Sequence, residues 1–96
     1  MLYKEHENQH LRLTILRTLK VDTDYQINES LLRDAIKVYG FGPSRDALRV
    51  QLRWLEEMGM VEITDLGALL VARLTERGAD VAIGAATVDG VKRPGP

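Results

Sequence analysis

The chain has 96 residues, contains no cysteine and carries a formal net charge of −1 at pH 7. This length allows one small domain, and the absence of cysteine excludes disulfides and thiolate metal sites. No apolar run is long enough to span a bilayer and the N-terminus lacks an apolar leader, so we expect a cytoplasmic protein. Domains that bind nucleic acid are more often basic, so that function would need a local basic face.

The first predicted helix covers residues 10–20. Its apolar residues recur at helical spacing and form one stripe, made of Leu11, Leu13, Ile15, Leu16 and Leu19. Residues 21–24 are polar and break the pattern, and residues 25–27 have the composition of a very short strand. Asn28 is suited to cap a second helix, which Gly40 is placed to end.

A third helix, from Arg45 to about Met58, has the clearest boundaries in the chain. Residues 41–43 form a tight connection before it, Ser44 is its predicted N-cap and Gly59 its predicted end. Its apolar residues fill a helical arc of about 200°, which suits a helix packed between two other helices and a hairpin. These residues are Ala47, Leu48, Val50, Leu52, Trp54, Leu55 and Met58.

The C-terminal part is predicted to form a hairpin and a short helix. Residues 60–64 have the composition and alternation of a strand. After a turn, residues 68–74 are predicted to form a second strand that returns antiparallel. A short last helix begins at Thr75 or Glu76 and ends at Gly84.

We therefore predict an α+β fold that is mainly α, with a three-helix core, a two-stranded hairpin and a short C-terminal helix. One folded domain covers residues 1–84. Residues 85–96 have little to bury and are predicted to form an extended or flexible tail.

The order of these elements resembles a winged helix-turn-helix domain. The segment "QLRWLEEMGMVE" is similar to a recognition helix that ends at a glycine and enters the wing, and "LTERG" to the junction that closes the wing. More narrowly, "SRDALRVQLRWLEEMG", "LTERGADVAIG" and "VDGVKRPGP" together resemble a family of small winged-helix proteins of Mu-like prophages. The resemblance covers nearly the whole chain and implies a winged-helix regulator, although such motifs specify fold better than function.

The candidate DNA-binding surface is the N-terminal half of the third helix. In a helix-turn-helix domain this half enters the major groove, where arginine binds guanine or phosphate. Arg45, Arg49 and Arg53 follow one another at intervals of four and form one ridge. Ser44 and the free N–H groups of the first turn suit a further phosphate.

The same ridge has a second interpretation as a solvated face. Asp46, Glu56 and Glu57 lie on or beside it, and Glu57 is spaced to pair with Arg53. On this interpretation the arginines make ion pairs within the protein and contact no DNA.

The hairpin turn and the tail add two further candidate contacts. Wings that touch DNA usually carry Arg or Lys at the turn, whereas Asp65 and Leu66 are acidic and apolar, so Leu66 points to a protein partner instead. In the tail, Lys92 and Arg93 suit a phosphate backbone, and the prolines around them equally suit an extended segment that docks on a partner.

Residues 6–10 read "HENQH", the spelling of a zinc-protease helix. That chemistry needs a third protein ligand beside His6 and His10, and these are the only histidines in the chain. There is also no phosphate-binding glycine loop and no nucleophile paired with a base. We therefore predict no metal site, no cofactor and no enzymatic activity.

These features lead to two hypotheses. The first is a sequence-specific DNA-binding protein, a small phage or prophage transcriptional regulator that binds double-stranded DNA as a homodimer. Its predicted DNA contacts are Ser44, Arg45, Arg49, Arg53, Lys92 and Arg93, with a recognition helix over residues 44–58. The alternative is a winged-helix module that binds protein, through the hairpin turn or the tail, and does not bind DNA.

Overall fold

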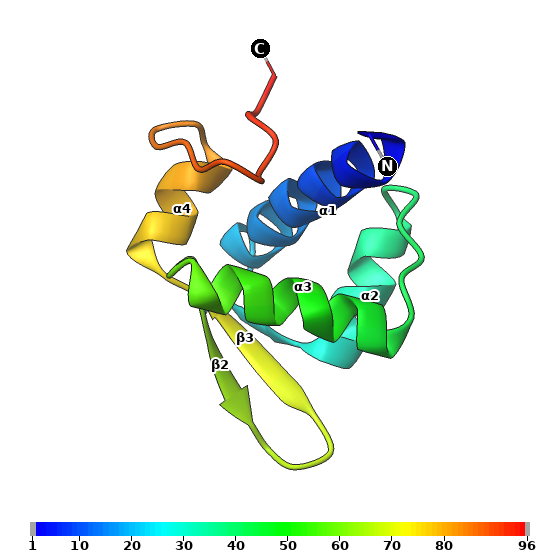
Figure 1. The fold of residues 1–96 in the computed structure, drawn as a ribbon. Coiled ribbons are helices and arrows are strands. Elements are labelled where there is room, and N and C mark those ends of the chain that lie inside the picture. Colours follow the sequence, from blue (N-terminus) through cyan, green and yellow to red (C-terminus); the bar gives the residue numbers. More distant parts are fainter. Residues whose placement is uncertain (1, 96) are drawn as a thin grey trace.

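The computed structural model describes residues 2–95 and shows an α+β protein. Helices α1, α2 and α3 pack together, the hairpin of β2 and β3 extends away from α3, and α4 lies beside α1 (Figure 1). In chain order the elements are α1 (Leu2–Lys20), β1 (Gln26–Asn28), α2 (Glu29–Lys37), α3 (Arg45–Glu57), β2 (Val61–Asp65), β3 (Leu70–Leu74) and α4 (Glu76–Ala82). No helix within residues 2–95 is long and apolar enough to cross a membrane.

The three strands form one antiparallel sheet in the order β1-β3-β2. Ala72 lies at its centre, opposite Ile27 of β1 on one side and Ile63 of β2 on the other. Alternate residues of β3 are buried against the helices, and these are Leu70, Ala72 and Leu74. The short strand and the hairpin were both predicted, whereas the pairing of β1 with β3 was not.

Local capping residues set the helix boundaries as predicted. The Asn28 side chain accepts a hydrogen bond from the Leu31 N–H (2.9 Å), and the Ser44 hydroxyl accepts one from the Ala47 N–H (3.0 Å). Gly59 follows α3 with φ of +79°, a backbone conformation that costs little only in glycine. The predicted strand-to-helix and helix-to-strand junctions are thereby confirmed.

The first helix begins at Leu2, earlier than the predicted start at residue 10. Its first turns are polar and therefore show no apolar periodicity. They are held by local contacts, an ion pair between Lys4 and Glu7 (3.7 Å) and a hydrogen bond from Gln9 to Glu5 (3.2 Å). Such pairs stabilise a helix without leaving a hydrophobic pattern in the sequence.

The hydrophobic core joins residues of all four helices and the hairpin to Val91 of the C-terminal segment, and Ala86 and Val88 of the same segment pack against it. Val91 is 7% exposed, so the prediction that residues 85–96 have little to bury is wrong at this position. The segment is tied to α1, because the Lys92 N–H donates to the Gln9 carbonyl (3.2 Å) and Arg12 donates to the Gly90 carbonyl (2.9 Å). A single valine between glycine and lysine offers no periodicity from which burial is predicted.

The apolar arc of α3 is only half covered. Leu48, Leu52 and Leu55 are fully buried, as predicted, whereas Val50 is 64% exposed and Met58 lies at the surface. Trp54 is half-buried at the edge of the core, with the Arg12 guanidinium 4.0 Å from its ring centroid. The helix is therefore packed on one side only, and its outer face is accessible to a partner.

Candidate functional site

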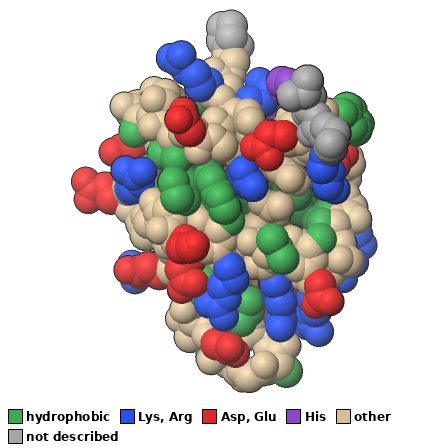
Figure 2. Space-filling view, in the orientation of Figure 1, with side chains coloured by type: hydrophobic (Ala, Val, Ile, Leu, Met, Phe, Trp, Pro, Cys, Tyr) green, Lys and Arg blue, Asp and Glu red, His purple; other side chains and the backbone are tan. Residues whose placement is uncertain are grey.

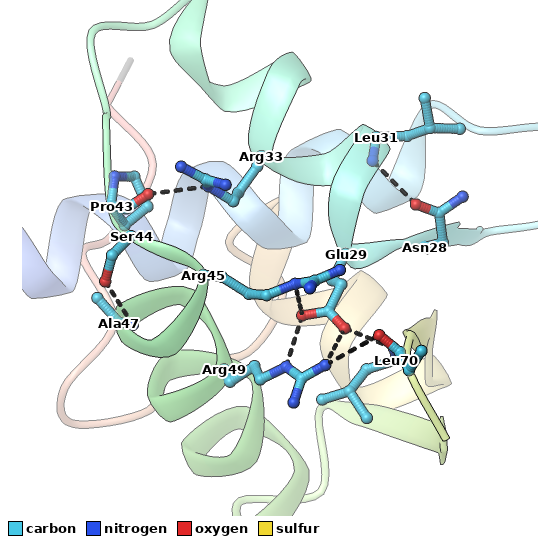
Figure 3. A network of polar contacts seen from close by, with 11 residues as sticks. Asn28, Glu29, Leu31, Arg33, Pro43, Ser44, Arg45, Ala47, Arg49 and Leu70 are labelled. Carbon is cyan, nitrogen blue, oxygen red and sulfur yellow. Dashed lines mark hydrogen bonds and ion pairs between the residues drawn. The ribbon is translucent and has the colours of Figure 1, made fainter. Parts of the chain in front are cut away.

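A buried carboxylate lies beneath the start of α3. Glu29, the first residue of α2, has no exposed surface. Arg49 donates to both of its oxygens, from Nε to Oε1 (2.7 Å) and from Nη2 to Oε2 (2.6 Å), and the Leu70 N–H donates to Oε2 (2.7 Å). Arg45 contributes a further cation, with Nε 3.7 Å from Oε1 (Figure 3). The network joins α2, α3 and β3.

These contacts keep Glu29 ionised although it is buried. The hydrogen bonds from Arg49 lower the pKa of the carboxyl group to about 2, and they outweigh the burial that alone would raise it. The Leu70 N–H and the charge of Arg45 contribute to the same lowering of the Glu29 pKa. The same hydrogen bonds raise the pKa of the Arg49 guanidinium, so both partners are charged at neutral pH.

The connection before α3 brings a third guanidinium group to the same place. Arg33 of α2 donates from Nε to the Pro43 carbonyl (3.0 Å), directly before the Ser44 cap (Figure 3). This hydrogen bond fixes the connection to α2. Its acceptor is a neutral carbonyl, so the bond does not neutralise the positive charge of Arg33. Arg33 thus lies beside the connection that leads into α3, and Arg45 and Arg49 lie on the first half of the helix itself.

The predicted ridge of arginines exists, but its members differ in their surroundings. Arg45 has a half-exposed side chain, whereas Arg49 is 34% exposed and held by Glu29 on two of its nitrogens. The sequence left open whether Arg49 contacts DNA or makes an ion pair within the protein. In the structure Arg49 is the main partner of a buried charge, Glu29, which no sequence pattern had indicated.

Arg53 links α3 to the hairpin. Its Nη1 lies 3.0 Å from Glu56 and its Nη2 lies 3.9 Å from Asp65 at the end of β2. The predicted partner was Glu57, one residue further along the helix, so that pairing is wrong. Two acidic groups beside one arginine leave little positive charge at this end of the ridge.

Lys92 and Arg93 lie away from the start of α3. They are exposed and line a hollow with His6 and Gln9 of α1, and in Figure 1 the C-terminal segment lies above α3, whereas the first turn of α3 lies beside α2. The six residues predicted to contact DNA therefore do not form one continuous site. Ser44, Arg45 and Arg49 come together, and Lys92 and Arg93 form a separate basic group.

The surface over α3 carries charges of both signs. Figure 2 shows Lys and Arg side chains gathered over α3 toward the hairpin, with Asp and Glu side chains among them. The overall charge of −1 thus includes a local basic cluster. In the first half of the helix Glu29 is buried, and the exposed acids near Arg49 are Asp65 and Asp46.

The two histidines lie on the exposed side of α1. The His10 ring packs edge-on against Phe41, with ring centroids 5.6 Å apart. Among the described residues, no group of three His, Asp or Glu side chains is arranged to hold a metal ion. His10 therefore has a packing role at the junction of α1 with the connection after α2.

Glu29 and Arg33 were missed by sequence reasoning. Glu29 follows the Asn28 cap, where an acid is expected on the surface because it complements the helix dipole. The partners that bury it, Arg49 and Leu70, come from later elements of the chain. No local pattern in the sequence predicts the contacts of Glu29 with Arg49 and Leu70.

The fold and the Glu29 network define a small α+β protein with guanidinium groups at the start of an exposed helix. No protein-family model matches the chain, and no solved structure matches it. An uncharacterized protein of Escherichia phage Mu, gp26, is 48% identical over 85 residues, which cover 88% of each chain. An uncharacterized protein of Haemophilus influenzae is 41% identical over 78 residues, 80% of this chain and 76% of that protein.

The chain therefore belongs to the family of the phage Mu protein gp26. This confirms the predicted relation to proteins of Mu-like phages.

Proposed function

We propose that the protein is a winged helix-turn-helix DNA-binding protein, a small phage-type transcriptional regulator that places the first half of α3 in the major groove. The sequence of elements supports this, since α2, a short connection, α3 and a hairpin follow one another as in that class. Strands β2 and β3 then correspond to the wing. The helix has an open outer face over its whole length, as a groove-binding helix requires.

The observation that carries the proposal is the position of Glu29 beneath Arg45 and Arg49. A carboxylate under two arginines orients their guanidinium groups while it stays out of contact with an incoming phosphate. Arg45 and Arg49 share this carboxylate, whereas Arg33 is bound only through the neutral Pro43 carbonyl. Preorganised guanidinium groups suit bidentate binding of guanine or phosphate.

The roles of the arginines differ in this proposal. Arg45 is the main base or phosphate contact, because it is half-exposed and 3.7 Å from Glu29 rather than in a close bidentate pair. Arg49 fixes the helix to the hairpin and supports Arg45. Lys92 and Arg93 give a separate, sequence-independent phosphate contact only where the DNA bends toward α1.

The test is a binding titration with a duplex selected from genomic fragments, followed by fluorescence anisotropy at two salt concentrations. Arg45→Gln is expected to weaken specific binding by roughly 10–100-fold, the cost of about 1–3 kcal/mol for a lost base contact. Lys20→Gln is the matched control, because it also removes one positive charge but lies at the end of α1, outside α3. It is expected to cause little loss of DNA affinity. An absence of binding by the folded wild type at low salt would refute the proposal.

The alternative function, a winged-helix module that binds protein, is favoured by one observation. Leu66 at the hairpin turn is 64% exposed, and the neighbouring Asp65 faces Arg53, so this turn has no free cation to offer a phosphate. On this alternative Leu66→Asp abolishes capture of a protein partner, and Arg45→Gln has no effect. On the DNA-binding proposal Arg45→Gln weakens DNA binding, and Leu66→Asp has little effect on it.

A further inference from the structure

A second exposed surface runs along α1 and the end of α2. It includes Tyr3 (80% exposed) on α1 and Val21 (84% exposed) directly after the helix, with Glu7, His10 and Arg17 between them. Beside it lie Val38 (81% exposed), Tyr39 (67% exposed) and Phe41. We call this set the α1 face. It contains four of the large exposed apolar side chains of the molecule.

The α1 face is one continuous surface. His10 and Phe41 line both of its hollows, the one toward Tyr3 and the one toward Val21. Figure 1 shows why, because the first turns of α1 lie beside the connection that follows α2. Exposed apolar groups that adjoin in this way mark a surface that another molecule covers.

The spacing along α1 is that of a helix that packs on a second helix. Tyr3, His10 and Arg17 follow at intervals of seven, and Glu7, Thr14 and Val21 form a second series at the same interval. Two such series offset by four residues form one seam on a helix. Thr14 is small and nearly buried at the base of the groove, so it leaves room for a side chain from outside.

The order of charges along this seam decides the occupant. Acidic Glu7 lies in the first half of α1, and basic Arg17 lies in its last turn. When the seam meets a copy of itself in the opposite direction, Glu7 stands opposite Arg17 of the second copy, and Tyr3 opposite Val21. A parallel arrangement would instead place like charges together.

We propose that a second copy of this chain docks on the α1 face, with the two α1 helices antiparallel. The interface is isologous, so each opposed pair occurs twice about the two-fold axis. Val38, Tyr39 and Phe41 flank the helix pair and are covered with it. The proposal does not rest on DNA binding, because the α1 face includes none of the residues around Glu29.

The experiment is sedimentation equilibrium of the full chain without DNA, over micromolar to millimolar concentrations. The wild type is expected to show a monomer–dimer equilibrium. Arg17→Glu and Glu7→Arg should each raise the dissociation constant at least about tenfold, because opposed charges become like charges. The double variant, with both charges exchanged, should return toward the wild-type value. Leu66→Asp at the hairpin turn is the control and should leave the equilibrium unchanged.

The outcomes separate the proposal from other arrangements. A folded wild type that stays monomeric overturns it and leaves the α1 face to a different protein. A dimer that ignores both reversals uses another surface, and a double variant as weak as the single ones excludes the antiparallel alignment. Because the chain has no cysteine, a mixture of Tyr3→Cys and Val21→Cys chains gives an independent check by forming disulfide-linked dimers.

Discussion

Two buried charged side chains, Glu29 and Arg12, lie in different parts of the molecule and are satisfied in different ways. Glu29 lies under α3 and is bound by two arginines and a backbone N–H. Arg12 is 8% exposed on α1 and donates to the neutral oxygens of Gln51 (2.7 Å) and Gly90 (2.9 Å). Its nearest carboxylate belongs to Glu5, 3.7 Å away at the surface.

The difference shows in the two pKa values. Close guanidinium partners lower the pKa of Glu29 to about 2 and so favour its charged form. Burial lowers the pKa of Arg12, against its charged form, and Glu5 offsets only part of this. Within residues 2–95 no buried side-chain nitrogen or oxygen lacks a hydrogen-bond partner. The Glu29 network is thus stabilised by opposite charges. Arg12 is stabilised by hydrogen bonds to neutral oxygens and by its contact with the Trp54 ring.

The largest expected effect is that of Arg49→Ala. The substitution leaves Glu29 buried without its main partner, and we expect it to lower the free energy of unfolding by about 3 kcal/mol. This is the lower end of the cost of breaking a buried pair, because Arg49 is one-third exposed and water can replace part of the contact. Urea unfolding followed by circular dichroism measures the change.

Arg45→Ala is the matched control on the same helix. Its longer contact with Glu29 and its half-exposed side chain predict a loss below about 1 kcal/mol. Equal losses for the two variants would contradict the unequal roles assigned to them.

The second prediction concerns acid. The pKa of Glu29 is about 2 in the folded protein against an ordinary 4.5, so its contribution to stability is complete above pH 4.5 and is lost as the pH falls toward 2. Of a total of about 3 kcal/mol, about 2 kcal/mol should be lost by pH 3. Unfolding at a series of pH values should show a smaller loss in Glu29→Gln, which has no proton to gain. Parallel curves for the two proteins would place the acid sensitivity in other carboxylates.

Apart from the Arg45→Ala control, the smallest expected effect is that of Arg12→Met. Methionine fills part of the same space, so the loss of about 1–2 kcal/mol comes mainly from the unpaired Gln51 and Gly90 oxygens. The C-terminal segment should then detach locally, and trypsin should cleave after Lys92 faster than in the wild type. A faster cleavage in Arg49→Ala at conditions where it is folded would show that the two networks are coupled.

Local signals made most of the fold predictable. Asn28, Ser44 and Gly59 act within a few residues of their own positions, so their roles follow from the sequence alone. The polar first turns of α1 and the buried Val91 did not follow, because neither has a periodic apolar pattern. Pairing of β1 with β3 depends on packing across the whole chain.

The candidate site was predictable only in part. The spacing of Arg45 and Arg49 on one ridge is local and was predicted, whereas the carboxylate beneath them was not. Glu29 is 20 residues from Arg49 and 41 from Leu70, and it has the position of an ordinary surface acid at a helix start. Sequence periodicity places a side chain on a face, but it does not identify what the opposite element contributes.

The long separation between Glu29 and Leu70 also bears on the order of folding. The carboxylate exchanges its water for the Leu70 N–H only after β3 has docked, a contact that closes 41 residues of chain. Helices α2 and α3 can meet beforehand through Arg49, whose contact spans 20 residues. Docking of the hairpin is therefore expected to be a late step in folding. An incorrectly docked hairpin would leave the Leu70 N–H without its acceptor on Glu29. In this way a single acid at the start of α2 discriminates between correct and incorrect placements of a strand far along the chain.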